Sequence, residues 1–290
     1  MEGIIVVNKP KGWTSRQVVN EVTKITGVKK IGHTGTLDPL ATGVMVLCIG
    51  KATKIAELIT GYDKEYVAEG ILGIETDTLD IEGKILRENR IHNISKEKIK
   101  KVLTKFIGKI NQEVPKYSAI KIKGRKLYEY ARSDIEIELP KREIDIYSIK
   151  LLEDVMVYGE KLKFKIKCKV SKGTYIRSLI RDIGRELNTV ATLSSLERVK
   201  QGDYTIAESY TIADVKNNDF CIITIKEALK NFPTFKVRKE IVKQVKNGVI
   251  LDNTFFQSIF GLLNDGDELI ALYKTYEKDP TKVKPYKMFI

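Results

Sequence analysis

Residues 161–170 read KLKFKIKCKV, a strict alternation of lysine and apolar side chains. Successive side chains of a β-strand point to opposite faces of its sheet, so a period of two predicts a strand here. One face of that strand joins a hydrophobic core, and the other carries five lysines in a row. The chain must therefore build at least one sheet that is buried on one face.

Helical patterns occur beside this strand. Thr14 and Gln17 have the spacing of a capping box, and Gly27 is a natural helix end. Strands and helices follow one another without a regular βαβ rhythm. We therefore expect an α+β fold, with a mixed, largely antiparallel sheet flanked by helices. The ranges with helical periodicity include 14–27, 95–109 and 178–187.

The net charge of the chain indicates what kind of molecule it binds. Lysine and arginine number 51 against 38 acidic residues, a net charge of +13, which suggests a polyanion. A solubilising lysine surface is the alternative. No apolar run reaches the roughly 20 residues of a membrane helix, and the three cysteines lie far apart in apolar segments. With two histidines and no glycine-rich phosphate loop, we expect a cytoplasmic protein with no metal, nucleotide cofactor or membrane contact.

The strongest local feature is GHTGTLDPLATG, residues 32–43, a glycine-rich loop with one acid, Asp38. An Asx turn, in which the carboxylate accepts backbone N–H groups, is one interpretation. The other is an ionised carboxylate that acts as nucleophile or base, which benefits from a nearby cation. Arg177 in SKGTYIRS is the candidate cation. The glycines would let the backbone turn sharply.

A second feature is KYSAIKIKGRKLYEYAR, residues 116–132, with six basic residues, one acid and three tyrosines. Basic groups can hold phosphates while tyrosines stack on unpaired bases. A solvated basic hairpin with its tyrosines packed in the core fits the segment equally well.

Six motifs together resemble the tRNA pseudouridine-55 synthases, the TruB-type family. NKPKGWTS and GHTGTLDPLATG are followed by GIETDTLDIEG, YSAIKIKGRKLYEYAR, GTYIRSLIRDIG and ATLSSLERV, in the family's order. Val114 and Asp134 depart from it, since the family commonly has proline and glycine there. The resemblance implies a catalytic domain at 1–232 with an RNA-binding insertion, and a small PUA-like RNA-binding module at 233–290.

The resemblance also implies the reaction. Members of the family turn one uridine of the tRNA T loop into pseudouridine, without a cofactor and without an obligatory protein partner. Asp38 resembles the essential aspartate, which attacks the sugar or assists departure of the base. Arg177 resembles the arginine that pairs with it. Tyr66 resembles the tyrosine that stacks on the uracil, and removal of the C5 proton is the bolder role for it.

Further residues are placed by the same likeness. His33 resembles the histidine that fills the position left by a flipped base. Lys9 and Tyr175 resemble residues that line the pocket, and Leu196 resembles an apolar neighbour of the uracil. Each of these residues also has a simpler interpretation. These are a loop histidine bonded to backbone for His33, a solvent-exposed lysine for Lys9, a core tyrosine for Tyr175, a core leucine for Leu196 and a buried strand tyrosine for Tyr66. For the RNA backbone the basic candidates are Lys121, Lys123, Arg125, Lys165 and Lys167.

Two rival functions remain at this point. One is an RNA-folding protein whose pocket no longer catalyses a reaction, and the intact set of Asp38, Tyr66 and Arg177 argues against it. The other is the related guide-RNA-dependent synthase, a subunit of a larger particle. The compact chain without long tails favours a stand-alone enzyme.

Overall fold

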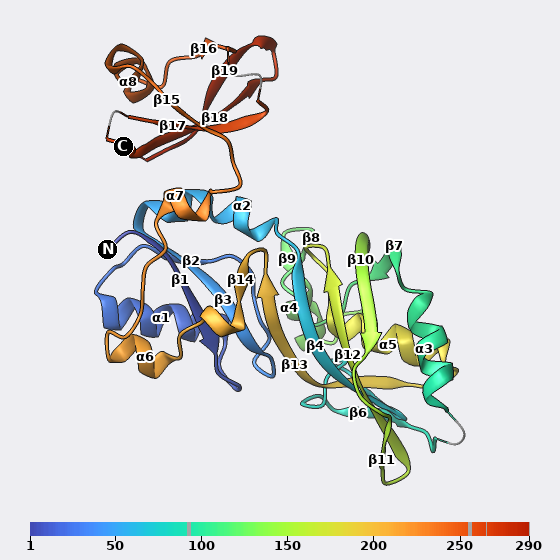
Figure 1. The fold of residues 1–290 in the computed structure, drawn as a ribbon. Helices are drawn as coiled ribbons and strands as arrows, with labels where there is room; N and C mark the ends of the chain where they lie inside the picture. Colours follow the sequence, from blue (N-terminus) through green and yellow to red (C-terminus); the bar gives the residue numbers. More distant parts are fainter. Residues whose placement is uncertain (92–93, 255–256, 265, 290) are drawn as a thin grey trace.

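The computed structural model describes residues 1–91, 94–254, 257–264 and 266–289. Within these ranges a large sheet of ten strands carries most of the chain, and a smaller sheet of five strands ends it (Figure 1). The strands of the large sheet are β1 Gly3–Lys9, β2 Ile31–His33, β3 Thr42–Ile49, β4 Lys64–Leu72, β7 Gly108–Glu113, β10 Lys141–Leu151, β11 Met156–Tyr158, β12 Lys161–Val170, β13 Ala191–Gln201 and β14 Tyr204–Thr205.

The path of the large sheet runs β1-β3-β13-β4-β12-β10-β7, with β2, β14 and β11 paired at its sides. Among its described strand pairs, β3 and β13 run parallel and the others antiparallel. Two short hairpins lie outside it. They are β5 Ile74–Thr76 with β6 Ile85–Glu88, and β8 Lys121–Ile122 with β9 Arg125–Lys126. The expectation of a mixed, largely antiparallel sheet with helices is confirmed.

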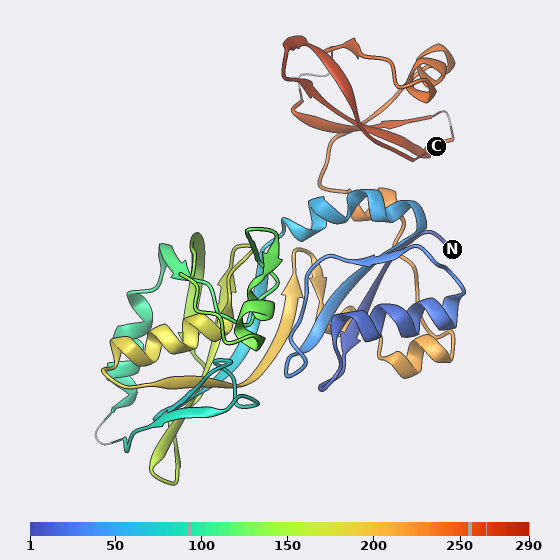
Figure 2. The same cartoon turned by 180° about the vertical axis from the view of Figure 1, so that it is seen from behind.

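Helices cover the face of the sheet to which the apolar side chains of β12 point, and β1 and β3 are also buried on the opposite face. Figure 2 shows α1, α4 and α5 in front of the sheet. Helix α5 and the neighbouring α3 share one hydrophobic cluster with the apolar side chains of β12, and α1 packs on β1 and β3. The helices, including two short 3-10 segments, are α1 Ser15–Thr26, η1 Gly50–Ile55, α2 Ala56–Thr60, α3 Lys96–Thr104, α4 Leu127–Arg132, α5 Ile176–Glu186, η2 Ile206–Glu208, α6 Ile212–Lys216, α7 Ile225–Ala228 and α8 Lys239–Lys246.

The alternating segment forms strand β12 with the bounds expected from the sequence. It pairs with β4, so that Cys168 lies opposite Tyr66, and β4 pairs on its other side with β13, where Arg198 lies opposite Tyr66. Directly opposed residues of antiparallel strands point to the same face. Tyr66 and Arg198 therefore share the buried face with the apolar side chains of β12.

The expected helix at 95–109 is too long. Ser95 caps it as predicted, but α3 ends at Thr104, and strand β7 begins at Gly108. Gly108 has φ 102°, a conformation that strongly favours glycine and cannot continue a helix. Phe106 remains buried in the same cluster as the helix, which explains why the apolar pattern ran past the helix end.

The C-terminal sheet has the order β15-β17-β18-β19-β16 and forms the small β module that was expected. It begins at Thr234, close to the division expected after residue 232, and that division itself stays a prediction. Leu272 and Phe289 pack in one cluster with Ala52 and Ile55 of the large domain. Its elements besides α8 are β15 Thr234–Lys236, β16 Leu251–Asp252, β17 Ile259–Leu263, β18 Leu269–Tyr276 and β19 Asp279–Met288.

Candidate active site

The loop that carries Asp38 connects β2 to β3 and is fixed by the N-terminal turn. The Leu37 N–H donates to Ser15 Oγ at 2.9 Å, and the Pro39 carbonyl accepts from the Gly12 N–H at 2.8 Å. The Asp38 carbonyl closes a turn by accepting from the Ala41 N–H. The carboxylate itself, 37% exposed, takes its described hydrogen bonds from a side chain rather than from its own turn. It is therefore open to a reacting group from one side.

That side chain belongs to Arg177 in the first turn of α5. Arg177 Nε lies 2.9 Å from one carboxylate oxygen of Asp38, and Nη2 donates to the other at 3.2 Å. This two-point grip fixes the plane of the carboxylate as well as its charge. The sequence proposed this partner, and the structure brings the two residues together across 139 positions of the chain.

Arg177 also binds two backbone carbonyls. Nη1 donates to the Thr78 carbonyl at 2.8 Å and Nη2 to the Tyr117 carbonyl at 3.0 Å. Asp80 lies 3.9 Å away and receives a hydrogen bond from the Thr78 hydroxyl. Burial raises the pKa of Asp80, while Thr78 and Arg177 oppose that rise. The arginine is 6% exposed and has little freedom to leave the aspartate.

Tyr66 and Leu196 lie on adjacent strands of the buried face, in the cluster that includes Leu37 and Leu40 of the Asp38 loop. Tyr66 is 7% exposed and Leu196 8%. Burial raises the pKa of the Tyr66 phenol, and the neighbouring Arg198 works in the opposite direction. The Tyr66 ring and the Leu196 side chain thus lie in the same cluster as Leu37 and Leu40, on either side of Asp38 in the sequence.

Lys9 is fully buried and holds loops together. Its Nζ donates to the carbonyls of Pro10 at 2.9 Å, Trp13 at 2.5 Å and Pro39 at 3.3 Å. Burial lowers its pKa to about 8, and Asp38 partly counteracts this. Its three partners are backbone oxygens of the N-terminal turn and of the Asp38 loop, so Lys9 holds the Asp38 loop against the N-terminal turn. A solvent lysine is not what the structure shows.

His33 and Tyr175 flank the same region. His33 lies in β2, and its buried Nδ1 has no hydrogen-bond partner among the described residues. Burial, Arg16 and Arg198 lower its pKa, which keeps the imidazole neutral at pH 7. Tyr175 precedes α5, and its backbone is gripped by Gln112. The Gln112 amide donates to the Tyr175 carbonyl at 3.0 Å and accepts from its N–H at 2.8 Å.

The lysine face of β12 is paired with acids and lies away from Asp38. Leu37 and Leu40 pack on the apolar face of this strand, so its lysines point from the other side of the sheet. Lys165 lies 3.1 Å from Glu153, and Lys167 lies 3.2 Å from Glu65. The same holds for the pairs Lys161–Glu88, Lys163–Glu69 and Lys169–Asp63. The structure does not bring Lys165 and Lys167 to the Asp38 site, and their contact with RNA stays a prediction.

The basic insertion lies close to Arg177. Its Tyr117 carbonyl binds Arg177, while Lys121 and Lys123 are exposed. The guanidinium of Arg125 stacks 5.0 Å from the centre of the Tyr130 ring and donates to the Glu129 carbonyl. Both interpretations of the segment stay open, since its tyrosines are half-buried.

The two departures from the family pattern are accommodated in the same region. Val114 is buried, with 1% of its surface exposed. Asp134 takes φ 50°, the left-handed conformation that glycine would adopt easily and that aspartate tolerates better than most residues.

Sequence reasoning missed three residues of this region. Asp80 lies within the motif GIETDTLDIEG, which entered the sequence analysis only as part of the family resemblance. Arg198, in ATLSSLERV, is 1% exposed, and its alternation with Leu196 along the strand was a usable signal. Gln112 had no signal, because its partner Tyr175 is 63 positions away.

The glycines of the loop have different surroundings. A Cβ on Gly43 would lie 2.3 Å from the Arg198 carbonyl oxygen, so the close approach there is to β13. At Gly32 the space is open.

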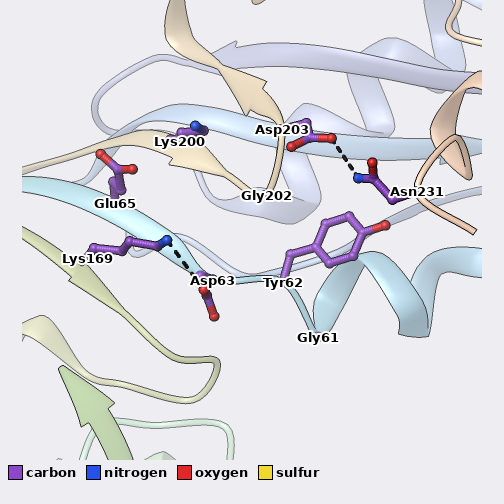
Figure 3. A pocket seen from close by; sticks show the side chains of 9 residues that line it. All are labelled: Gly61, Tyr62, Asp63, Glu65, Lys169, Lys200, Gly202, Asp203 and Asn231. Carbon is purple, nitrogen blue, oxygen red and sulfur yellow. Dashed lines mark hydrogen bonds and ion pairs between the residues drawn. The ribbon is translucent and has the colours of Figure 1, made fainter. Parts of the chain in front are cut away.

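Two cavities lie near these elements. One of about 550 Å³ is lined by residues of the insertion, such as Tyr117, together with Asp77 and Arg181 of α5. It lies on the same face of the sheet as Asp38. Another of about 400 Å³ lies on the lysine face, where Lys169 pairs with Asp63 and Asp203 with Asn231 (Figure 3). The described ranges contain no cluster of three metal-ligating side chains and no helix long and apolar enough to cross a membrane.

Comparison with known proteins identifies relatives of the chain. The family described as TruB family pseudouridylate synthase (N terminal domain) matches residues 23–176, more than half of the chain. A tRNA pseudouridine synthase B of Geobacillus thermodenitrificans is 39% identical, with both chains covered in full. One of Fusobacterium nucleatum is 54% identical over 71% of this chain and 70% of its own.

Solved structures show the same fold. A chain of the "Structure of H/ACA RNP bound to a substrate RNA containing 2'-deoxyuridine" has a TM-score of 0.71 at 25% identity, covering 99% of this chain and 85% of that one. A chain of the "Crystal Structure of a Cbf5-Nop10-Gar1 Complex" has a TM-score of 0.70 at 26% identity, covering 99% and 83%. From the family match and the full-length relative, the chain belongs to the TruB family of pseudouridylate synthases.

Proposed function

We propose that this protein isomerises uridine 55 in the T loop of tRNA to pseudouridine, as a stand-alone cytoplasmic enzyme. The observation that carries the proposal is the Asp38 carboxylate, held at two points by a buried guanidinium and still open on one side. A carboxylate oriented in this way is suited to act at a sugar carbon. The full-length relative named tRNA pseudouridine synthase B supports tRNA as the substrate.

The reaction balances without an added group. The bond between N1 of uracil and C1′ of ribose breaks, the base turns, and a bond forms between C5 and C1′. The C5 proton leaves and a proton is taken up at N1, so isomerisation needs no cofactor. Asp38 either attacks C1′ or assists the departing base, and Arg177 keeps it in place for both routes.

The base must leave the stack to reach Asp38. His33 is proposed to fill the vacated position, since a neutral ring with a free buried nitrogen suits that role. Tyr66 is proposed to stack on the flipped uracil, with Leu196 packed beside it. Lys121, Lys123 and Arg125 are proposed to hold the RNA backbone. The module formed by 233–290 is proposed to contact tRNA outside the T loop.

The test is release of a C5 tritium label from uridine 55 in a bare T-arm stem-loop, with no other protein present. We expect one label released per stem-loop by the wild-type protein. Asp38→Asn should abolish release and keep the RNA affinity and melting temperature, because the amide matches the carboxylate in size but is a poor nucleophile and base. Turnover by a folded Asp38→Asn protein, free of deamidation, would refute the catalytic role of Asp38.

The same assay separates the rival functions. The structural neighbours from H/ACA particles make a guide-dependent subunit the second candidate. Release that needs an added guide RNA or protein would identify that candidate. Tight binding of the stem-loop by the wild type without any release would indicate an RNA-folding protein instead.

A further inference from the structure

Arg198 lies at the centre of the sheet and is the largest of its fully buried side chains. Strand β13 places it opposite Tyr66 of β4 on one side and Gly43 of β3 on the other. It is 1% exposed. The Arg198 side chain therefore lies between β4, which carries Tyr66, and β3, which follows the Asp38 loop.

Its guanidinium binds both ends of the Asp38 loop. Nε donates to the Val44 carbonyl at 2.6 Å and Nη2 to the Gly35 carbonyl at 3.1 Å. Gly35 precedes Asp38 by three residues and Val44 follows it by six. The fit is close, since a Cβ at position 35 would lie 3.2 Å from Nη1 of Arg198.

The charge of Arg198 has neutral partners. Among the described residues these are the two backbone carbonyls and the phenol of Tyr66, and no carboxylate forms an ion pair with it. A buried cation without an acid is costly, so such a group usually has a functional reason. Its field reaches Tyr66 and His33, since it lowers the pKa of both side chains.

We propose that Arg198 is a positioning residue for the reaction. Its guanidinium holds both ends of the Asp38 loop at a fixed distance from the Tyr66 ring. The Asp38 carboxylate and the Tyr66 ring are then both correctly placed against the uracil. This inference rests on the proposed function. Its role differs from that of Arg177, which grips the carboxylate itself, and from that of Lys9, which holds the middle of the loop at Pro39.

The test compares Arg198→Met and Arg198→Lys with the wild type in single-turnover conversion of a T-arm stem-loop at saturating enzyme. Because a reacting group displaced by about 1 Å can cost about 100-fold in rate, we expect a loss of about that size for Arg198→Met. RNA affinity should change little, since Arg198 is buried away from phosphates. Arg198→Lys keeps the positive charge but loses the planar set of N–H donors that binds two carbonyls at once, so it should recover only part of the rate.

Gln201→Met is the matched control. Gln201 lies on the same strand, is fully buried, and also donates to two separate segments, at the Thr34 hydroxyl and the Ile59 carbonyl. It binds the Asp38 loop at one end only, at Thr34, and lies opposite Lys64 rather than Tyr66. We expect Gln201→Met to lower the melting temperature as Arg198→Met does, and to keep the single-turnover rate.

Two outcomes overturn the inference. A full rate in folded Arg198→Met or Arg198→Lys overturns the inference. Equal rate losses in Arg198→Met and Gln201→Met also overturn it, because they would reflect general loosening of the sheet. If Arg198→Met does not fold, Arg198→Lys decides alone. An inactive Asp38→Asn protein beside a fully active Arg198→Lys protein would refute this inference and leave the proposed function standing.

Discussion

Arg177 is the residue on which the most distant parts of the site depend. Its guanidinium binds Asp38, the Thr78 carbonyl and the Tyr117 carbonyl, which belong to three separate segments. One of those segments is the basic insertion. A change in the position of the insertion therefore reaches the carboxylate through a single side chain, without any intervening residue.

Replacing Arg177 by lysine should lower the single-turnover rate strongly. An ammonium cannot grip both oxygens of Asp38 and also bind Thr78 and Tyr117, and a displaced carboxylate can cost about 100-fold. RNA affinity should stay near that of the wild type.

Arg181→Lys is the control for this change. Arg181 lies one turn further along α5, is equally buried, and pairs with Glu113 and Asp182 instead of Asp38. Equal rates in the two variants would show that the fork of Arg177 has no special role.

Lys9→Met should destabilise the protein. It leaves the carbonyls of Pro10 and Trp13 without this donor, while Pro39 keeps the Gly12 N–H, and an unsatisfied buried polar group costs about 1–3 kcal/mol. Thermal melting should show a lower midpoint than that of Lys11→Met, which changes an exposed lysine of the same turn. An unchanged midpoint in Lys9→Met would mean that water replaces the ammonium at no cost.

At the level of elements, strand β12 separates two environments. Its apolar face supports the Asp38 loop and α5, and its lysine face meets the acids of neighbouring segments. Exposed ion pairs of this kind contribute little to stability, but they reduce the positive charge that phosphate would meet. The insertion differs, because Lys121 and Lys123 are exposed and have no ion pair among the described residues.

The salt dependence of RNA binding should distinguish these two elements. Lys121→Ala with Lys123→Ala should weaken binding and lower the slope of log affinity against log salt by about 0.7–0.9 for each phosphate that the protein no longer neutralises. The matched double change Lys165→Ala with Lys167→Ala should alter the slope less. A larger effect at Lys165 and Lys167 would place the RNA on the other side of the sheet.

Several elements follow from local sequence alone. The strict alternation of 161–170 defined β12, and the capping box of Thr14 with Gln17 and the stop at Gly27 defined α1. Pairing across the chain could not be derived in this way. The acids that meet the lysines lie on other strands and loops, and the carbonyls that hold Lys9 and Arg198 carry no side-chain signal. The Asp38–Arg177 contact was proposed from residue type, and only the fold supplies its geometry.

For the whole molecule, the C-terminal module is attached by packing as well as by the chain. Phe289 and Leu272 contribute to the cluster that includes Ala52 and Ile55. Lys54 donates to the Met288 carbonyl at 2.6 Å, and Glu57 pairs with Lys287 at 2.7 Å. The module is therefore held in a defined place relative to η1 and α2 of the large domain (Figure 1).

Phe289→Ser should loosen this attachment, because it removes an almost fully buried ring, 6% exposed. We expect weaker binding of full-length tRNA and nearly unchanged binding of an isolated T-arm stem-loop, measured by filter binding at one salt concentration. Equal losses on both RNAs would indicate that the module serves stability rather than tRNA contact.

The acid-paired lysine face has a consequence for how the enzyme meets its substrate in solution. A protein of net charge +13 attracts tRNA from all directions, and collisions on the wrong side would delay productive ones. Since the five lysines of β12 are matched by carboxylates, long-range attraction is weaker on that side. The electric field of the molecule is then uneven, and it should steer diffusing tRNA toward the side where Asp38 lies.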